Sequence, residues 1–550
     1  MPGNARKFVR VTKLLLAGVT IFCVSWIACI NEWHTRIRWN GKQGDSARRF
    51  STMRTIVAYS EEKQAELDRP SPVTCDRLPA FPELPHINRT WMPGIAQEPD
   101  WQRVEGTQVS LYAAYYDNRT PQKYVRILAS YHGRNFSASG ILYCQTRSQN
   151  SYEESLEVVT AKPLEIWWHE WDTLSAEIDS PLLLSCPLTE SLFNTAIVSI
   201  VTEPCENPTN SFIINPVKRN RYKRKFTICV KDMNFNEDIS QYLIEWIETN
   251  KILGADIIDI YVDNVSKDIE AVLSYYRDKN QLRLFNVPTK YKPDRTFWQR
   301  RRDHIITYND CLYRNMEESE FIIPIDIDEI VLPKIATTWS ELISRLTNLG
   351  WSPIEHSSIM IRNVFFFEFM QKRVTLQPED LTVHENITYV KRDDVRIDND
   401  ARFNNNEIKS PVFNLSNEVI DVKIHNKFND KYKTTCGIEF PKPKLLSHFI
   451  SSAKISPIGH YSKSFMLTKR VLTAFNHYPL ASLGAIGISG WSAPFNEVQL
   501  NHYKKSCNTT MVSECEQYNK RTRLDRGAQR LESQLLSALA NVICSGIKII

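Results

Sequence analysis

The chain has 550 residues, of which 42% are apolar, 11% aromatic and 24% charged. That length exceeds what one hydrophobic core supports, and the composition is that of a globular protein rather than a disordered or repetitive one. The formal net charge is +5, but Arg6, Lys7, Arg10 and Lys13 supply four of these charges and leave +1 for the rest of the chain. So small a charge argues against a nucleic-acid partner.

An apolar segment lies close to the N-terminus. Residues 14–30 form an uncharged run of 17 residues, the lower limit for a helix that spans a membrane. The run is longer than a usual signal-peptide core and no small-x-small cleavage site follows, which favours a transmembrane signal anchor over a cleaved signal peptide. Residues 1–13 would then be a cytoplasmic tail, and residues 31–550 would lie in the lumen as in a type II membrane protein.

Cysteine usage agrees with a lumenal location. Ten of the twelve cysteines follow the apolar run, without Cys-x-x-Cys spacing, which favours disulfides over a zinc site. The pairing cannot be deduced, and Cys229 and Cys311 lie in apolar strand and helix patterns, so we expect these two to be buried free thiols. Seven glycosylation acceptor sequences also fit a lumenal chain: Asn88, Asn118, Asn135, Asn264, Asn386, Asn414 and Asn508.

Composition shifts along the chain predict its domain organisation. Residues 31–104 are polar and then proline-rich, which predicts a stem. Residues 105–217 alternate apolar and polar side chains in short runs, which predicts a small β-rich domain. The basic run 218–225 is typical of a solvated linker. The main domain is expected over 226–510, followed by a helical extension over 511–550.

Within the main domain the pattern changes to strands that alternate with helices. We expect strands over 226–231, 256–262, 281–285 and 321–333, and helices over 237–253, 268–276 and 302–316. This alternation predicts an α/β fold with an open, mostly parallel sheet and helices on both faces, and ligands in such sheets lie at the carboxyl ends of the strands. No Gly-x-Gly-x-x-Gly follows the first strand, which disfavours a dinucleotide-binding fold.

Three carboxylates interrupt the fourth of these strands: Asp326, Asp328 and Glu329. Uncompensated carboxylates are costly to bury, and a cation would compensate them. In an extended strand Asp326 and Asp328 would point to the same side and approach one ion. Oxygen ligands favour Mg2+ or Mn2+, and two carboxylates would leave positions free for phosphate oxygens, as in a nucleotide-sugar site. The alternative is that the acids cap a helix or form salt bridges.

Several motifs occur in a fixed order along the main domain: Ile228-Cys-Val-Lys231, Tyr308-Asn-Asp-Cys-Leu-Tyr-Arg314, Ile325-Asp-Ile-Asp-Glu329, Glu407-Ile-Lys-Ser410, Val422-Lys-Ile-His425-Asn426 and Asn501-His-Tyr-Lys504. In this ordered set the chain resembles glycosyltransferase family 92. The resemblance implies a GT-A-like fold, a type II Golgi membrane protein and metal dependence. It also implies inverting transfer of a hexose, most often galactose from UDP-galactose, to a glycan or glycoprotein acceptor.

The resemblance also implies a third metal ligand beside Asp326 and Asp328. In GT-A enzymes a histidine near the end of the catalytic domain often has this role, which points to His502, with His425 as the alternative. An imidazole ligand would favour Mn2+ over Mg2+.

Other polar residues of the main domain are candidates for donor binding and catalysis. The donor-binding candidates are Lys231 and Asp263 beside the uridine, and Arg301 and Lys409 beside the diphosphate. An inverting transfer needs a carboxylate that deprotonates the acceptor hydroxyl. The sequence does not identify this base, and its candidates are Glu368, Asp393, Asp394 and Asp421. For Arg301 and Lys409 the alternative is that each is a solvated or ion-paired side chain.

Two other functional classes share features with this sequence. The order Asp326-x-Asp328-x-Ile330 is close to the Asp-x-Asp-x-Thr/Val pattern of haloacid-dehalogenase-like phosphatases. In those proteins the motif strand begins the domain, whereas three β-α units are expected before it here. The second class is a non-catalytic glycan-binding or adhesion ectodomain with a transferase-like fold, and the presence of both aspartates argues against it.

Overall fold

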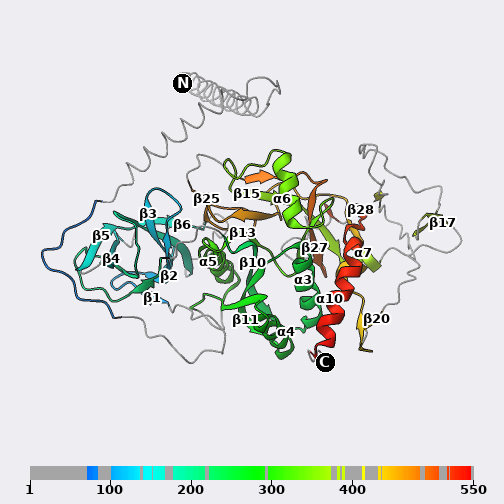
Figure 1. The fold of residues 1–550 in the computed structure, drawn as a ribbon, viewed down its shortest axis with the longest axis horizontal. Helices are drawn as coiled ribbons and strands as arrows, with labels where there is room; N and C mark the ends of the chain where they lie inside the picture. Colours follow the sequence, from blue (N-terminus) through cyan, green and yellow to red (C-terminus); the bar gives the residue numbers. More distant parts are fainter. Residues whose placement is uncertain are drawn as a thin grey trace, which may run out of the picture. The chain divides into compact units, whose positions relative to one another are not determined.

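The computed structural model describes residues 71–83, 101–134, 136, 140–150, 153–167, 178–216, 222–290, 295–372, 381–384, 387–390, 412–414, 431–434, 436–483, 490–506, 517–518 and 521–546 (Figure 1). Residues 68–550 form one compact unit. Within the described ranges, no helix has both the length and the apolar character needed to cross a membrane. The predicted tail and anchor, and most of the predicted stem, lie outside these ranges.

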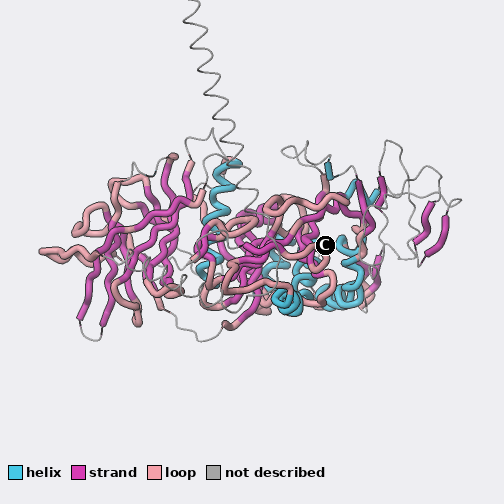
Figure 2. Tube along the Cα trace, turned by 90° about the horizontal axis from the view of Figure 1, so that it is seen from above, coloured by secondary structure: helices cyan, strands magenta, loops and turns pink. Residues whose placement is uncertain are grey.

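The first strands form two antiparallel sheets that face each other. One sheet has the order β1 (Gln102–Arg103), β2 (Val109–Asp117), β3 (Lys123–His132), β7 (Asp179–Leu188) and β6 (Lys162–Glu165). The other has the order β5 (Glu153–Thr160), β4 (Tyr143–Asn150), β8 (Ala196–Val201) and β9 (Phe212–Ile214). Leu111, Ile127 and Leu184 of the first sheet share a core with Val198 and Ile200 of the second. Figure 2 shows this region as strands and loops. The alternating pattern is therefore that of a β-sandwich.

A seven-stranded sheet forms the centre of the main region. Its order is β12 (Leu282–Asn286), β11 (Ile257–Val265), β10 (Arg224–Phe235), β13 (Ser319–Pro324), β23 (Lys463–Leu467), β15 (Ser358–Ile361) and β26 (Gly490–Ser492). The first four strands are parallel, whereas β23 runs antiparallel to both β13 and β15. The prediction of a mostly parallel sheet is right for the predicted strands, but the complete sheet is mixed.

Helices cover both faces of this sheet, as expected. Ile228 and Ile260 point into one core with the helices α3 (Ser240–Leu253), α4 (Lys267–Asp278) and α6 (Trp339–Asn348). The next residues along the strands, Cys229 and Tyr261, face α5 (Phe297–Asn315) on the other side. This is the two-residue alternation of a strand that is buried on both faces.

The predicted ends of α3 and α5 were more accurate than their predicted starts. α3 ends at Gly254, whose φ of 115° is left-handed and is readily adopted by glycine. α5 begins five residues before its predicted start, because the Thr296 hydroxyl accepts a hydrogen bond from the Gln299 amide and caps the helix there.

The predicted strand 321–333 is two strands in two different sheets. β13 ends at Pro324, and β14 (Glu329–Pro333) belongs to a three-stranded sheet with β27 (Val498–Lys504) and β16 (Asn363–Phe367). Asp326 and Asp328 lie in the turn between them, where the Glu329 amide donates to the Asp326 carbonyl at 3.0 Å. The expectation that both aspartates share one side of an extended strand is therefore wrong, because the chain leaves one sheet here and enters another.

The remaining elements are short, except for the last helix. They are α7 (Glu368–Lys372), β17 (Leu381–His384), β18 (Ile387–Val390), β19 (Val412–Asn414), β20 (Lys431–Lys433), β21 (Glu439–Pro441), α8 (Lys444–Ser447), β22 (Ile450–Ser452), β24 (Val471–Thr473), β25 (Ala481–Ser482), β28 (Arg521–Leu524), η5 (Gly527–Leu531) and α10 (Glu532–Cys544). α10 packs beside α3 (Figure 1) and adds Leu535 and Leu539 to the main core. The predicted helical extension therefore contains a strand as well as a helix.

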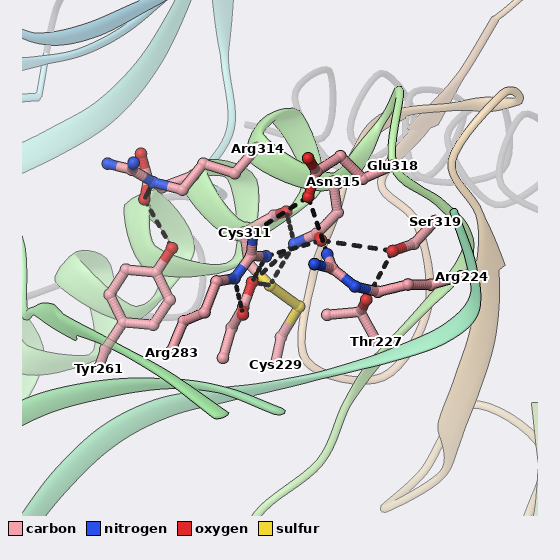
Figure 3. A network of polar contacts seen from close by, with 12 residues as sticks. Arg224, Thr227, Cys229, Tyr261, Arg283, Cys311, Arg314, Asn315, Glu318 and Ser319 are labelled. Atoms are coloured by element: carbon pink, nitrogen blue, oxygen red, sulfur yellow. Dashed lines mark hydrogen bonds and ion pairs between the residues drawn. A yellow bond between two sulfur atoms is a disulfide. The ribbon is translucent and has the colours of Figure 1, made fainter. Parts of the chain in front are cut away.

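Four disulfides connect the described residues: Cys75–Cys205, Cys144–Cys186, Cys229–Cys311 and Cys436–Cys544. The preference for disulfides over zinc is confirmed. The expectation of free thiols at Cys229 and Cys311 is wrong, because β10 directs Cys229 toward α5, where Cys311 lies with its Cα atom 6.2 Å away (Figure 3).

Candidate functional site

The turn that carries Asp326 and Asp328 lies at the carboxyl end of β13, beside the parallel strand β10. Its shape is held by the adjoining Glu329 and by groups from distant parts of the chain. The Glu329 carboxylate accepts from the Asp326 amide at 2.9 Å, and the Asp328 carbonyl accepts from the Tyr503 amide at 2.8 Å. The Trp246 indole donates to the Glu329 carbonyl at 2.8 Å. The turn is thus fixed in place before any ligand binds.

Asp326 lies between two lysines. Its Oδ1 atom is 2.7 Å from Nζ of Lys231 on β10, and its Oδ2 atom is 3.1 Å from Nζ of Lys463 on β23. Burial alone would raise the pKa of Asp326, but the two ammonium groups lower that pKa well below its usual range. Lys463 is completely buried, and it also contacts Glu329 at 3.0 Å and Asn476 at 2.5 Å. The carboxylate is therefore ionised and faces two positive charges.

Asp328 faces a histidine instead. The register of β14 and β27 pairs Glu329 with His502, so the imidazole lies over the turn. Its Nε2 atom is 3.2 Å from Oδ2 of Asp328, whose side chain is 38% exposed. Burial opposes ionisation of Asp328, but the His502 imidazole outweighs it and lowers the pKa of the aspartate. One carboxylate and one imidazole nitrogen therefore converge at a position open to solvent.

The donor atoms of Asp328 and His502 fit a divalent cation, since a carboxylate oxygen and an unprotonated imidazole nitrogen are both good ligands for Mn2+. Asp326 differs, because both of its oxygens face lysines. Among the residues that the structure describes, no group of three or more His, Cys, Asp or Glu side chains is placed to hold a metal ion. A metal held by Asp326, Asp328 and His502 together stays a prediction.

Asp263 and Arg301, two of the predicted donor-binding residues, have protein partners. Asp263, at the end of β11, contacts the Arg295 guanidinium and accepts from the Asn234 amide at 2.8 Å. Arg301 lies over the ring of Phe297, with 4.7 Å between the guanidinium carbon and the ring centroid. Burial lowers the pKa of Arg301, and the Asp326 carboxylate partly offsets this, which places Arg301 within the electrostatic range of the turn.

Comparison with known protein families decides the identity of this region. The model of glycosyltransferase family 92 matches residues 224–533, which is more than half of the chain. The chain belongs to glycosyltransferase family 92. The matched segment contains the turn, both lysines and His502.

The chain is also similar to an individual protein. The Caenorhabditis elegans protein "Beta-1,4-galactosyltransferase galt-1" is 24% identical over 252 residues, which are 43% of this chain and 54% of that protein. The chain thus spans about half the length of the curated relative that it matches. The crystal structure of a Paenibacillus sp. cycloisomaltooligosaccharide glucanotransferase complexed with cycloisomaltoheptaose aligns at 10% identity over 51% of this chain and 33% of that chain. Its TM-score of 0.13 carries no argument about the fold.

The structure describes only one of the candidates for the base of this family 92 chain. Glu368 begins α7 and contacts Lys444 at 2.7 Å. Burial would raise the pKa of Glu368, but the Lys444 ammonium lowers it. The other candidates for the base, Asp393, Asp394 and Asp421, lie outside the described residues. The predicted donor-binding residue Lys409 and the alternative metal ligand His425 also lie outside them.

Sequence reasoning missed two members of the site. Lys463 and Asn476 come from the antiparallel half of the large sheet and the segment after it, which no local pattern connects with the turn. One signal was present, because Lys463 stands at the start of the apolar run Phe465-Met-Leu467 in a strand that is completely buried. A lysine in such a strand needs a carboxylate partner.

Proposed function

We propose that the chain is a metal-dependent glycosyltransferase of GT-A type, which transfers galactose from UDP-galactose to a glycan acceptor with inversion. Family membership supports glycosyl transfer, and the name of the Caenorhabditis elegans relative supports galactose as the sugar. The observation that carries the proposal is the turn itself. At the carboxyl end of a parallel strand, a converging carboxylate and imidazole lie beside two lysines.

Asp328 and His502 would hold the cation. Two protein ligands leave several coordination positions for diphosphate oxygens and water, and the mixed oxygen and nitrogen ligands favour Mn2+ over Mg2+. A bound divalent ion neutralises, as a Lewis acid, the negative charge that grows on the departing diphosphate. Asp326 is the third candidate ligand, provided that a phosphate oxygen replaces it at Lys231.

Lys231 and Lys463 supply positive charge to the same diphosphate. Both ammonium groups lie within 3.1 Å of the Asp326 carboxylate, so they are already directed toward an anion. Lys463 is held by Asn476 and Glu329 and does not have to be ordered when the donor binds. Preorganised charge of this kind stabilises the developing negative charge of the leaving group more than mobile charge does.

The base remains a choice among Glu368, Asp393, Asp394 and Asp421. Glu368 is held by Lys444, which lowers its pKa and makes it a weaker proton acceptor. We therefore consider Glu368 a weaker candidate for the base than Asp393, Asp394 or Asp421. Replacing each in turn by the corresponding amide, and measuring transfer against binding of UDP, separates a base from a structural residue.

The proposal is tested with the full-length chain in detergent, by measuring UDP release from a panel of UDP-sugars with Mn2+, with Mg2+ and with a chelator. We expect release from UDP-galactose that depends on the metal. Activity that is unaffected by the chelator would overturn the metal dependence. Glycan binding without release of UDP from any donor would instead indicate a non-catalytic ectodomain.

We also propose that the chain is a single-pass type II protein of the Golgi, with residues 31–550 in the lumen. Four disulfides among the described residues support an oxidising compartment. Endoglycosidase treatment of the protein from cells should increase its mobility, and protease added outside intact microsomes should remove only the short tail. Unchanged mobility together with complete digestion would reverse this orientation.

A further inference from the structure

Glu329 contacts Asp326, Lys463 and His502, yet it is not one of the proposed metal ligands. Its side chain is 3% exposed. Its Oε2 atom accepts from the Asp326 amide at 2.9 Å and lies 3.0 Å from Nζ of Lys463, and its Oε1 atom is 3.5 Å from Nδ1 of His502. We propose that Glu329 is a positioning residue, which holds the His502 ring with its Nε2 lone pair toward the metal position. This inference rests on the proposed metal-dependent transferase.

The need for such a residue follows from the protonation of the ring. An imidazole binds a metal only through an unprotonated nitrogen, so with Nε2 on the ion the single ring proton must be on Nδ1. In this structure Nδ1 of His502 is buried and has no hydrogen-bond partner at normal distance. The nearby acceptor is Oε1 of Glu329. Since Nε2 already lies 3.2 Å from Oδ2 of Asp328, a hydrogen bond between Nδ1 and Glu329 would keep Nε2 on the side of the metal position.

The surroundings restrict the ring and the carboxylate to this arrangement. Phe365 lies against the imidazole with 5.2 Å between the ring centroids, which limits rotation of His502. The two contacts of Oε2 with the Asp326 amide and Lys463 keep the Glu329 carboxylate from turning. Glu329 therefore connects the histidine, the turn and the buried lysine through one side chain. A carboxylate that fixes the outer nitrogen of a metal-binding histidine raises metal affinity, and its loss commonly costs 10-fold to 100-fold.

A simpler role for Glu329 is to neutralise the buried Lys463, and the two roles predict different results. If Glu329 only balances that charge, its replacement destabilises the fold and leaves the metal affinity of the folded protein unchanged. If it positions His502, metal affinity falls, and the fall depends on the presence of the histidine.

The test compares full-length variants in detergent, with Mn2+ binding in the presence of UDP followed by electron paramagnetic resonance. We expect Glu329→Gln to weaken Mn2+ binding by about 10-fold to 100-fold. Glu329→Asp keeps a charge near Lys463 but withdraws it from the ring, so it should fold and should also bind Mn2+ more weakly. The matched control is Glu497→Gln. Glu497 is likewise buried, ion-paired with Arg345 at 2.8 Å and located just before β27, but it stands five positions ahead of His502 along the chain.

A double-mutant cycle completes the test. In a His502→Gln background, Glu329→Gln should cause no further loss of Mn2+ affinity, because no imidazole is left to position. Equal Mn2+ affinity of wild type and both Glu329 variants would overturn the inference, and so would an undiminished loss in the His502→Gln background. Wild-type protein that binds no Mn2+ with UDP would overturn the proposed metal dependence and this role together, whereas the other two outcomes leave the metal dependence standing.

Discussion

Asp259 on β11 and the two aspartates of the turn after β13 differ in how completely the protein satisfies their carboxylates. Asp259 on β11 is completely buried, and Arg283 binds both of its oxygens at 2.7 and 2.6 Å. The Asn315 amide donates to the same carboxylate at 2.7 Å, beside the Cys229–Cys311 disulfide (Figure 3). At the turn after β13, by contrast, the side chains of Asp326 and Asp328 are 27% and 38% exposed.

Structural and functional acids in this fold can be separated by whether their oxygens are already bound by the protein. A buried carboxylate whose oxygens are all bound by the protein has no capacity left for a ligand, and it connects strands and helices. A carboxylate that is ionised, partly exposed and flanked by an imidazole or by lysines retains that capacity. The first arrangement describes Asp259 and the second describes Asp328. Asp326 lies between them, because one of its two lysines, Lys231, is partly exposed whereas the other, Lys463, is buried.

The largest loss of transfer activity is expected at Asp328. Asp328→Asn should reduce transfer by about 100-fold or more, because the site loses one of its two converging ligands and with it the stabilised charge. The melting temperature should change little, since the side chain is 38% exposed and its loss leaves no buried charge unpaired. The measurement is UDP release at saturating Mn2+ and UDP-galactose, with thermal melts of the same samples. Wild-type turnover in this variant would remove the turn from the active site.

Asp259 should show the opposite behaviour. Asp259→Asn leaves Arg283 without its main partner inside the protein, and breaking a buried pair in this way costs about 3 kcal/mol of unfolding free energy. Affinity for UDP should stay at the wild-type level in the folded fraction, because Asp259 reaches no solvent. Denaturant unfolding gives the first quantity and calorimetry the second. Weaker UDP binding with unchanged stability would place a ligand where we place only structural contacts.

The sequence predicted the parallel half of the large sheet, because each β-α unit is encoded by a local pattern. The antiparallel half pairs distant segments, such as Phe321 with Leu467, and no local pattern reveals such pairing. For the same reason the apolar run around Asp326 was interpreted as one strand. The turn contains no glycine or asparagine. Besides its local contacts with Glu329, it is held by contacts with Trp246 and Tyr503 that only the folded chain brings together.

The site divides in a similar way. Asp326 and Asp328 could be found because charged residues in an apolar run are unusual, whereas His502 came from family resemblance and not from its own surroundings. The contact between His502 and Asp328 depends on the register of β14 and β27, whose segments are separated by more than 160 residues. Disulfide pairing was unpredictable on the same physical ground, since the apolar pattern around Cys229 and Cys311 defines a buried face but not its partner.

Glu245 on α3 is a buried acid that differs from Asp259 in its partners. It accepts hydrogen bonds from the Lys444 and Leu445 amides but has no bidentate cation. Burial raises the pKa of Glu245 from 4.5 to about 7, although the two amides oppose this. A raised carboxyl pKa means that its contribution to stability is complete below pH 4.5 and is lost as the pH rises through 7. Each pH unit corresponds to about 1.4 kcal/mol, which sets an upper limit of about 3 kcal/mol for the loss.

Glu245→Gln keeps an acceptor oxygen for one of the two amides and removes the titration, and the loss of the other acceptor is independent of pH. Relative to wild type, the variant should therefore gain stability as the pH rises from 5 to 8, measured by denaturant unfolding at each pH. Parallel pH profiles of the two proteins would show that Glu245 is ionised throughout this range and belongs with Asp259.

The smallest expected effect is at Asp263, which tests where the boundary between the two kinds of acid falls. Its side chain is 11% exposed, between the values of Asp259 and Asp328, and it lies at the carboxyl end of β11, where we expect the uridine. Asp263→Asn removes one partner of Arg295, but this guanidinium still has Asp303 at 3.3 Å and Asp232 at 3.6 Å, so the fold should lose little stability. If the carboxylate also accepts hydrogen bonds from the nucleotide, UDP affinity measured by calorimetry should fall by about 1 kcal/mol, or about 5-fold.

Asp278→Asn, at an exposed aspartate on α4, is the matched control and should bind UDP as wild type does. Unchanged UDP affinity in Asp263→Asn would group Asp263 with Asp259, as an acid whose partners are all within the protein, and would move the uridine to another part of the strand ends.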